Sequence, residues 1–340
     1  MRLLVKFQSS MNKYIKYLAI GILTGGGIAI ALLMRASTTQ SDSPATPVLG
    51  VTTPTHPAWT VSVPTYASLT PDFKPATGSP APSVTPTFPP DSILAGQIAQ
   101  ILPDYGGDWN ILIRADGTRD MVALNADRKN HVASIAKVPI AMLFFKTLEK
   151  RGVPPEEYEV FLSKWGVERT YMQLLTAMLV ESEEQATGIM MEIIADSKID
   201  VPAILEAWGA PNTDISNRYS TPRDIATLYE DLYYGNVIAP KGREVILRLL
   251  SAYTENDDTR LGVLRPFLNA DSEYYNKRGT LTKERLVIGD SALLAFDANG
   301  ERKVYVIVVV GYAGELPTTD VELVKGIEAI ARSFWDFIRP

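Results

Sequence analysis

The order of apolar and polar residues divides the 340-residue chain into three parts. Residues 17–34 form an apolar run without a charged residue, and residues 36–90 show no apolar period. From residue 91 onward, apolar residues recur at the intervals of helices and strands. The pattern therefore predicts one folded region, residues 91–340.

Within this region, helical patterns dominate the middle and alternating patterns lie toward both ends. The predicted elements are a helix at Asp91–Leu102, a hairpin of Trp109–Arg114 and Met121–Asn125, helices from Ser134 to about Leu250, strands at Leu286–Phe296 and Lys303–Gly311, and a helix at Thr319–Ile338. Thr221-Pro-Arg-Asp224 predicts a helix start, with Thr221 as N-cap and Asp224 reaching back. Strands at both ends around a helical middle favour an α/β (α+β) fold, in which one antiparallel sheet packs against helices.

The first ninety residues predict a membrane anchor followed by a linker. Residues 1–16 hold four basic residues and no acid, and the eighteen apolar residues that follow are about the minimum for a membrane span. Basic residues before the span place residues 1–16 in the cytoplasm and the folded region outside, with residues 17–35 as a single-pass anchor in the cell membrane. A cleavable signal peptide is the alternative, although Leu33–Ser37 lacks a small-x-small cleavage site. Residues 36–90 contain twelve of the twenty-three prolines and predict a disordered, extended linker.

Composition limits the chemistry that the folded region can perform. The chain has no cysteine and only two histidines, so a Cys–His or Ser–His nucleophile is nearly excluded. The net charge of −6 and the absence of a basic patch beyond the leader argue against nucleic acid as a partner. His131 is expected to be an ordinary loop or strand-end residue. We expect a monomer that needs no cofactor.

Ser134-Ile-Ala-Lys137 is the candidate nucleophile. It stands at the start of an apolar run with helical period, and residues three apart share a helix face, so the Lys137 amine can reach the Ser134 hydroxyl. The spacing alone is not specific, because Ser10-Met-Asn-Lys13 in the basic leader also has it. The alternative is a helix-capping serine followed by a surface lysine.

Three further motifs follow in order, and together the four resemble a known family. They are Ser182-Glu-Glu-Gln-Ala-Thr187, Ser220-Thr-Pro-Arg-Asp224 and Lys277-Arg-Gly279. With Ser134-x-x-Lys137, they resemble the penicillin-recognising serine hydrolases, and among these the class A β-lactamases most closely. The resemblance runs from about residue 93 to the C-terminus. It implies an antiparallel sheet packed against helices, with a helical subdomain inserted.

The resemblance also implies a role for each matching residue. Ser134 would be acylated, Ser182 would pass a proton to the leaving nitrogen, Lys277 would bind the substrate carboxylate, and the backbone N–H groups of Ser134 and Thr280 would form the oxyanion hole. Gly279, Glu184 and Arg278 would lie at the substrate-binding site. As the base, Lys137 needs its pKa lowered by about 3 units. Partial burial and the like charge of Lys277 are the expected causes. No metal is implied.

The chain departs from the family pattern at three points. Residues 208–220 are too few for the family's Glu-x-x-Leu-Asn loop and contain no glutamate; Asp214 is their only acid. Glu184 stands in place of an asparagine, where it could pair with Lys277 or Arg278 or act as a base. Arg278 replaces a small hydroxyl residue, and an ion pair with Glu184 across the cleft is one interpretation. The acidic segment Glu255–Asp258 predicts a loop.

These observations favour a membrane-anchored, extracytoplasmic serine hydrolase acylated on Ser134 by a β-lactam or by a peptidoglycan-peptide amide. Without the loop glutamate, deacylation is expected to be slow, as in a penicillin-binding protein. The alternative is a non-catalytic protein of the same fold that binds the cell wall or acts as a scaffold. Intact Ser134, Lys137, Ser182 and Lys277 favour the enzyme.

Overall fold

The computed structural model describes residues 93–166, 168–235, 237–252, 259–283, 285–314 and 318–339. The predicted leader, anchor and linker lie outside these residues, as does the acidic segment Glu255–Asp258. Across the ranges just given, no helix combines the length and apolar character that a membrane span requires.

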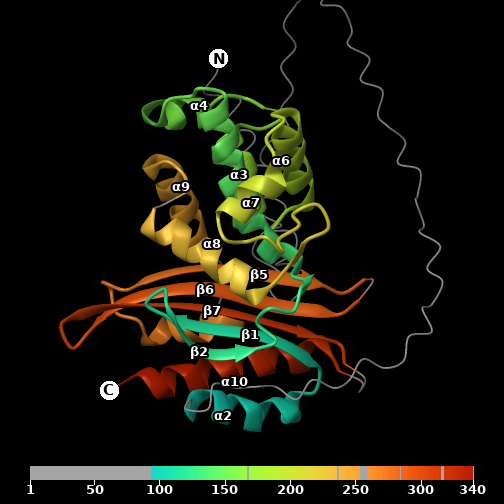
Figure 1. Ribbon diagram of the computed structural model, residues 1–340, viewed down its shortest axis with the longest axis vertical. Coiled ribbons are helices and arrows are strands. Elements are labelled where there is room, and N and C mark those ends of the chain that lie inside the picture. The colour runs from blue at the N-terminus through green and yellow to red at the C-terminus, as the bar shows by residue number, and fades with distance from the viewer. Residues whose placement is uncertain are drawn as a thin grey trace, which may run out of the picture. The chain divides into compact units, whose positions relative to one another are not determined.

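A five-stranded antiparallel sheet forms the centre of the fold (Figure 1). Its strand order is β2-β1-β7-β6-β5, so segments from the two ends of the folded region pair at β1 and β7. The strands are β1 (Asp108–Ala115), β2 (Arg119–Leu124), β5 (Glu273–Leu281), β6 (Val287–Ala298) and β7 (Glu301–Tyr312). The expectation of one antiparallel sheet built from both ends of the sequence is confirmed. The prediction of two closing strands missed β5, which lies at one of the two edges of the sheet, because its sequence is largely polar.

Helices cover both faces of the sheet (Figure 1). Side chains alternate between the faces along a strand: in β7, Val308 packs into the core on one side and Ile307 into the core on the other. One face carries α2 (Ile93–Ile101), the 3-10 turn η2 (Leu102–Tyr105) and α10 (Asp320–Ile338). Because β6 and β7 are buried on both faces, the sheet is a rigid base for the elements beside it.

The other face carries the helical part of the fold (Figure 1). Its elements are η3 (Ala133–Ala136), α3 (Lys137–Lys150), η4 (Pro155–Glu157), α4 (Tyr158–Leu162), α5 (Tyr171–Leu179), α6 (Glu184–Asp196), α7 (Val201–Ala207), α8 (Pro222–Tyr234) and α9 (Pro240–Leu250). Helix α3 is central, since its residues from Lys137 to Phe145 are all buried. Two short strands, β3 (Asn130–His131) and β4 (Tyr219–Ser220), pair beside η3, and the 3-10 segment η5 (Arg260–Phe267) leads toward β5.

The predicted start of α8 is confirmed. Thr221 is the N-cap, its hydroxyl oxygen accepts the Asp224 backbone N–H, and Pro222 is the first helical residue. The Asp224 carboxylate in turn accepts the Thr221 hydroxyl and the Asn212 backbone N–H. This motif is structural, because it fixes the loop before α8 to the helix.

The contact between α10 and β1 gives a test of packing. A Cβ on Gly326 would lie 2.5 Å from the Trp109 ring, whereas a Cβ on Gly96 of α2 would meet nothing within 4 Å. We expect Gly326→Ala to destabilise the protein by about 1–3 kcal/mol through overpacking. Gly96→Ala should instead stabilise it by about 0.5–1 kcal/mol through helix propensity. Denaturant unfolding of both variants checks this, and equal effects would contradict it.

Candidate active site

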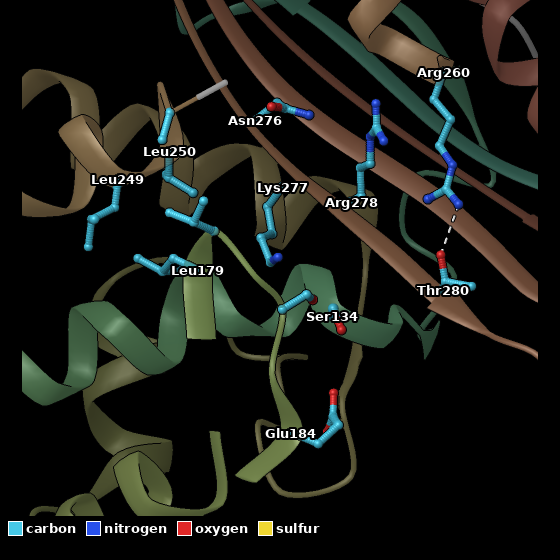
Figure 2. Close-up of a pocket in the computed structure, with 13 residues that line it drawn as sticks. Ser134, Leu179, Glu184, Leu249, Leu250, Arg260, Asn276, Lys277, Arg278 and Thr280 are labelled. Carbon is cyan, nitrogen blue, oxygen red and sulfur yellow. Dashed lines mark hydrogen bonds between the residues drawn. The ribbon is translucent and has the colours of Figure 1, made fainter. Parts of the chain in front are cut away.

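A cavity of about 420 Å³ opens between the edge strand β5, the turn η3 and the connection from α5 to α6. Figure 2 shows Ser134, Lys277 and Glu184 around it, each from a different element. The described residues that line it are Ser134, Leu179, Val180, Ser182, Glu184, Leu249, Leu250, Ala252, Arg260, Asn276, Lys277, Arg278 and Thr280. All the predicted site residues except Lys137 and Gly279 therefore line one cavity.

Ser134 lies in the 3-10 turn η3, one turn before α3 begins at Lys137. Its neighbour Ala133 has a φ of +50°, and the Ala133 N–H donates to Nδ1 of His131 at 3.1 Å. The Val132 N–H donates to the Arg218 carbonyl at 2.8 Å. His131 is a strand-end residue, as expected, and it also supports the unusual backbone beside Ser134. Several contacts thus fix the turn that carries the candidate nucleophile.

Lys137 is fully buried, which rules out a surface lysine beside a capping serine. Its amine donates to the Ser182 carbonyl at 2.7 Å, to the Ser182 hydroxyl at 3.2 Å and to Glu184 Oε1 at 2.7 Å. A lysine ammonium has three donors, and these three acceptors use them all. In this arrangement Lys137 is a cation directed at Ser182 and Glu184, and the contacts described for its amine do not include the Ser134 hydroxyl.

The pKa of Lys137 is lowered, as the sequence analysis expected, but one cause differs. Burial has the largest effect and lowers it, the hydrogen bond and charge of Glu184 raise it, and the charge of Arg218 lowers it. The like charge found to lower it is that of Arg218, which the sequence analysis did not consider. The sequence analysis could not identify this effect, because Arg218 is far from Lys137 in the sequence and belongs to the loop before β4.

Glu184 pairs with Lys137 and Arg218, so the interpretation of an ion pair with Lys277 or Arg278 is wrong. Its Oε1 accepts from Lys137 and, at 3.1 Å, from Arg218 Nη1, while Arg218 Nη2 binds Oε2. Partial burial raises the pKa of Glu184, but the hydrogen bonds and charges of Arg218 and Lys137 outweigh it and lower the pKa to about 2. Glu184 is therefore a firmly ionised carboxylate.

Ser182 occupies the connection between α5 and α6, with a φ of +57°. Its hydroxyl oxygen and its carbonyl both accept from Lys137. Since the hydroxyl accepts from the lysine, its own proton is available for donation into the cavity. This geometry suits a group that relays a proton from Lys137.

Strand β5 approaches η3 so closely that only glycine fits at position 279. A Cβ there would lie 2.7 Å from the Val132 carbonyl and 3.3 Å from the Ala133 Cβ. Lys277 is almost fully buried on the same strand, and Figure 2 shows its side chain directed into the cavity toward Ser134. Gly279 therefore determines how near Lys277 and Thr280 come to Ser134.

Arg260 and Asp290 also support the site, and the sequence analysis missed both. Arg260 donates to the carbonyls of Gly279 and Gly289 and to the Thr280 hydroxyl at 2.9 Å (Figure 2). The buried Asp290 accepts the Leu261 N–H and the Asn276 amide. Burial raises the pKa of Asp290 despite the charges of Arg260 and Arg278. No local motif marks either residue, because their partners come from η5 and two strands.

The remaining departures from the family pattern have clear positions. Arg278 lines the cavity, and its Nη2 donates to the Thr259 carbonyl at 3.2 Å. Asp214 accepts the N–H groups of Ser216 and Asn217 and the Asn217 amide, so it stabilises its own loop.

Among the described residues that line the cavity, Glu184 is the one carboxylate. In the part of the chain that the structure describes, no group of three or more His, Asp or Glu side chains could hold a metal ion.

Comparisons with known proteins identify the family of the chain and agree with its fold. A model of the beta-lactamase enzyme family matches residues 93–338. Among solved structures, an ancestral class A β-lactamase (GNCA) is 18% identical over 72% of this chain and 100% of that chain, with a TM-score of 0.58. A β-lactamase from Chitinophaga pinensis is 16% identical over 72% and 99%, and PBP-A is 20% identical over 74% and 98%; both have a TM-score of 0.56. No curated protein matches. At these identities the structures establish the fold.

The close approach at Gly279 predicts a sensitive position. Gly279→Ala places a methyl group against the Val132 carbonyl, so β5 or η3 must shift. We expect a loss of about 1–3 kcal/mol in the free energy of unfolding. Gly188→Ala in α6, where a Cβ meets nothing within 4 Å, is the control and should not destabilise. Denaturant unfolding of both variants measures this, and an unaffected Gly279→Ala protein would contradict the tight fit.

Proposed function

The chain belongs to the beta-lactamase enzyme family, and we propose that it is a serine hydrolase of the class A β-lactamase and penicillin-binding type that is acylated on Ser134. One observation carries the proposal: Ser134, Ser182 and Lys277 line a single cavity, and the Lys137 amine contacts Ser182 from beneath it. The substrate would be a β-lactam or a peptide amide of the cell wall.

The proposed acylation uses Lys137 in its neutral form. Its lone pair takes the proton from the Ser134 hydroxyl while the serine oxygen attacks the carbonyl carbon of the substrate. The carbon–nitrogen bond then breaks, the nitrogen takes the Ser182 proton, and the new Lys137 ammonium returns a proton to Ser182. The backbone N–H groups of Ser134 and Thr280 would stabilise the oxyanion, and Lys277 would bind the substrate carboxylate. Lowering the Lys137 pKa favours this mechanism, because more of the amine is neutral at a given pH.

Slow deacylation is the second part of the proposal. Glu184 is the one carboxylate among the described residues that line the cavity, and two cations hold its pKa at about 2. A carboxylate with so low a pKa is a weak base, so it is a poor activator of water. The acyl-enzyme is therefore expected to be long-lived, which fits a penicillin-binding protein better than an efficient lactamase.

We extend the proposal to the location of the protein. The basic leader, the apolar run 17–34 and the proline-rich linker 36–90 support a single-pass membrane anchor that holds the domain outside the membrane, near cell-wall peptides. The domain would act there as a monomer, without a cofactor. A non-catalytic wall-binding protein is the second candidate, and the direction of the Lys137 amine toward Glu184 rather than Ser134 favours it.

Mass spectrometry of the intact full chain after incubation with a penicillin tests the proposal. We expect a persistent adduct of one penicillin, absent from Ser134→Ala. Lys137→Ala should acylate about 10²–10⁴-fold more slowly, the usual contribution of a general base. If the wild type shows neither an adduct nor hydrolysis of the penicillin, the non-catalytic candidate is favoured. Undiminished acylation of Lys137→Ala would exclude Lys137 as the base.

The pH dependence of acylation tests the role of Glu184. The rate should rise with pH as Lys137 loses its proton, and Glu184 raises the pKa of that lysine. Glu184→Gln removes the negative charge, so the Lys137 pKa falls and the rising limb should move to lower pH. Glu183→Gln removes an equal charge one residue away and should leave the limb in place, because Glu183 pairs with Arg169. If the rising part of the plot of acylation rate against pH stays in place or moves to higher pH in Glu184→Gln, this role of Glu184 is contradicted.

A further inference from the structure

The ion pair between Arg218 and Glu184 connects the cavity to a loop that sequence motifs do not mark. Both guanidinium Nη atoms of Arg218 bind the carboxylate, one to each oxygen. One of these oxygens, Oε1, also accepts from Lys137. Paired donation of this kind is specific to arginine and fixes the plane of the carboxylate. The position of the oxygen opposite Lys137 thus depends on Arg218.

The loop that carries Arg218 is itself well fixed. Asp214 and Tyr219 exchange backbone hydrogen bonds of 2.7 and 3.0 Å, and the Asp214 side chain accepts two N–H groups within the turn. Arg218 has a φ of +57°, a conformation that costs a non-glycine residue energy unless its surroundings hold it. This backbone directs the side chain at Glu184.

The same residue also contacts the turn that carries Ser134. The Arg218 carbonyl accepts the Val132 N–H, two residues before Ser134, and the adjacent β4 pairs with β3. Arg218 therefore bonds to the nucleophile's turn through its backbone and to the partner of Lys137 through its side chain.

The charges that face Lys137 come from three elements. Glu184 of α6 contacts it directly, Arg218 lies behind Glu184 on the loop before β4, and Lys277 of β5 lines the cavity above. Although burial disfavours the protonated form of Lys137, Glu184 favours it. Arg218 opposes this in two ways: it shares the negative charge of Glu184, and its own positive charge repels the ammonium.

We propose that Arg218 is a positioning residue, which fixes the Glu184 carboxylate and shares its negative charge with Lys137, so that the amine releases its proton more readily to begin acylation. The proposal rests on the function proposed above and adds to it an electrostatic control from a different loop. It also explains how the site accommodates Glu184 where the family pattern has asparagine. The negative charge of Glu184 is balanced by Arg218, which belongs to the short loop before β4.

Titration of Lys137 by NMR tests this without any substrate. The full chain would be labelled in lysine side chains, with the Lys137 signal assigned by its loss in Lys137→Ala. We expect Arg218→Gln to move the titration of Lys137 to higher pH. At pH values below the Lys137 titration, acylation by a penicillin should slow about tenfold, the factor that one pKa unit gives. Arg169→Gln is the matched control, because it breaks the neighbouring Arg169–Glu183 pair and should move neither.

A double-mutant cycle shows whether Arg218 acts through Glu184. In the Glu184→Gln background, Arg218→Gln should shift the Lys137 titration by less than half as much. An unmoved titration in Arg218→Gln, or equal shifts in both backgrounds, would overturn the proposal. Arg218→Lys keeps the charge but loses the paired donation of the guanidinium, so Lys137 should titrate between its wild-type pH and its pH in Arg218→Gln. This variant serves if Arg218→Gln does not fold. A wild-type protein that no penicillin acylates would refute the proposed function, while the titrations would still decide the role of Arg218.

Discussion

The burial of a lysine cation beneath the cavity is the constraint on which the site depends. Moving a charge out of water costs several kcal/mol unless the charge is paired and hydrogen-bonded. Lys137 meets this requirement with three acceptors, two from Ser182 and one from Glu184. The connection between α5 and α6 is thereby tied to the start of α3. Glu184 also pairs with a second cation, Arg218.

The rigid sheet gives this arrangement a fixed opposite wall. Strands β6 and β7 are buried on both faces, and β5 follows β6 in register along its whole length. Gly279 lets β5 touch the turn that carries Ser134, and Arg260 fastens the same stretch from the side of η5. The edge strand β5 and the turn η3 at the start of α3 are therefore fixed in position relative to each other.

The departures from the family pattern form a connected set. Glu184 introduces a negative charge beside Lys137, and Arg218 balances it. The short loop that supplies Arg218 contains no glutamate of its own. A family member altered in this way keeps the groups proposed for forming an acyl-enzyme but lacks an efficient base for breaking it down. Under the proposed function, these electrostatics favour a long-lived acyl-enzyme over rapid turnover.

Local signals in the sequence were sufficient for much of the fold. Apolar periods predicted the hairpin, the central helices and the closing strands, because burial on one face imposes those periods. The cap at Thr221 was predicted correctly since its hydrogen bonds join residues close in sequence. Strand β5 was missed, because an edge strand beside a polar cavity carries few apolar residues.

The sequence by itself also determined which residues are candidates for the chemistry: Ser134, Lys137, Ser182 and Lys277 stand in motifs of fixed spacing. Only the tertiary structure decided how their charges interact. It directed Lys137 toward Glu184 and brought Arg218 close enough for its charge to lower the Lys137 pKa. It also placed the Arg260 guanidinium against the Gly279 carbonyl of β5. The physical reason is that motifs reflect contacts between near neighbours in the chain, whereas electrostatic partners are chosen by distance in space.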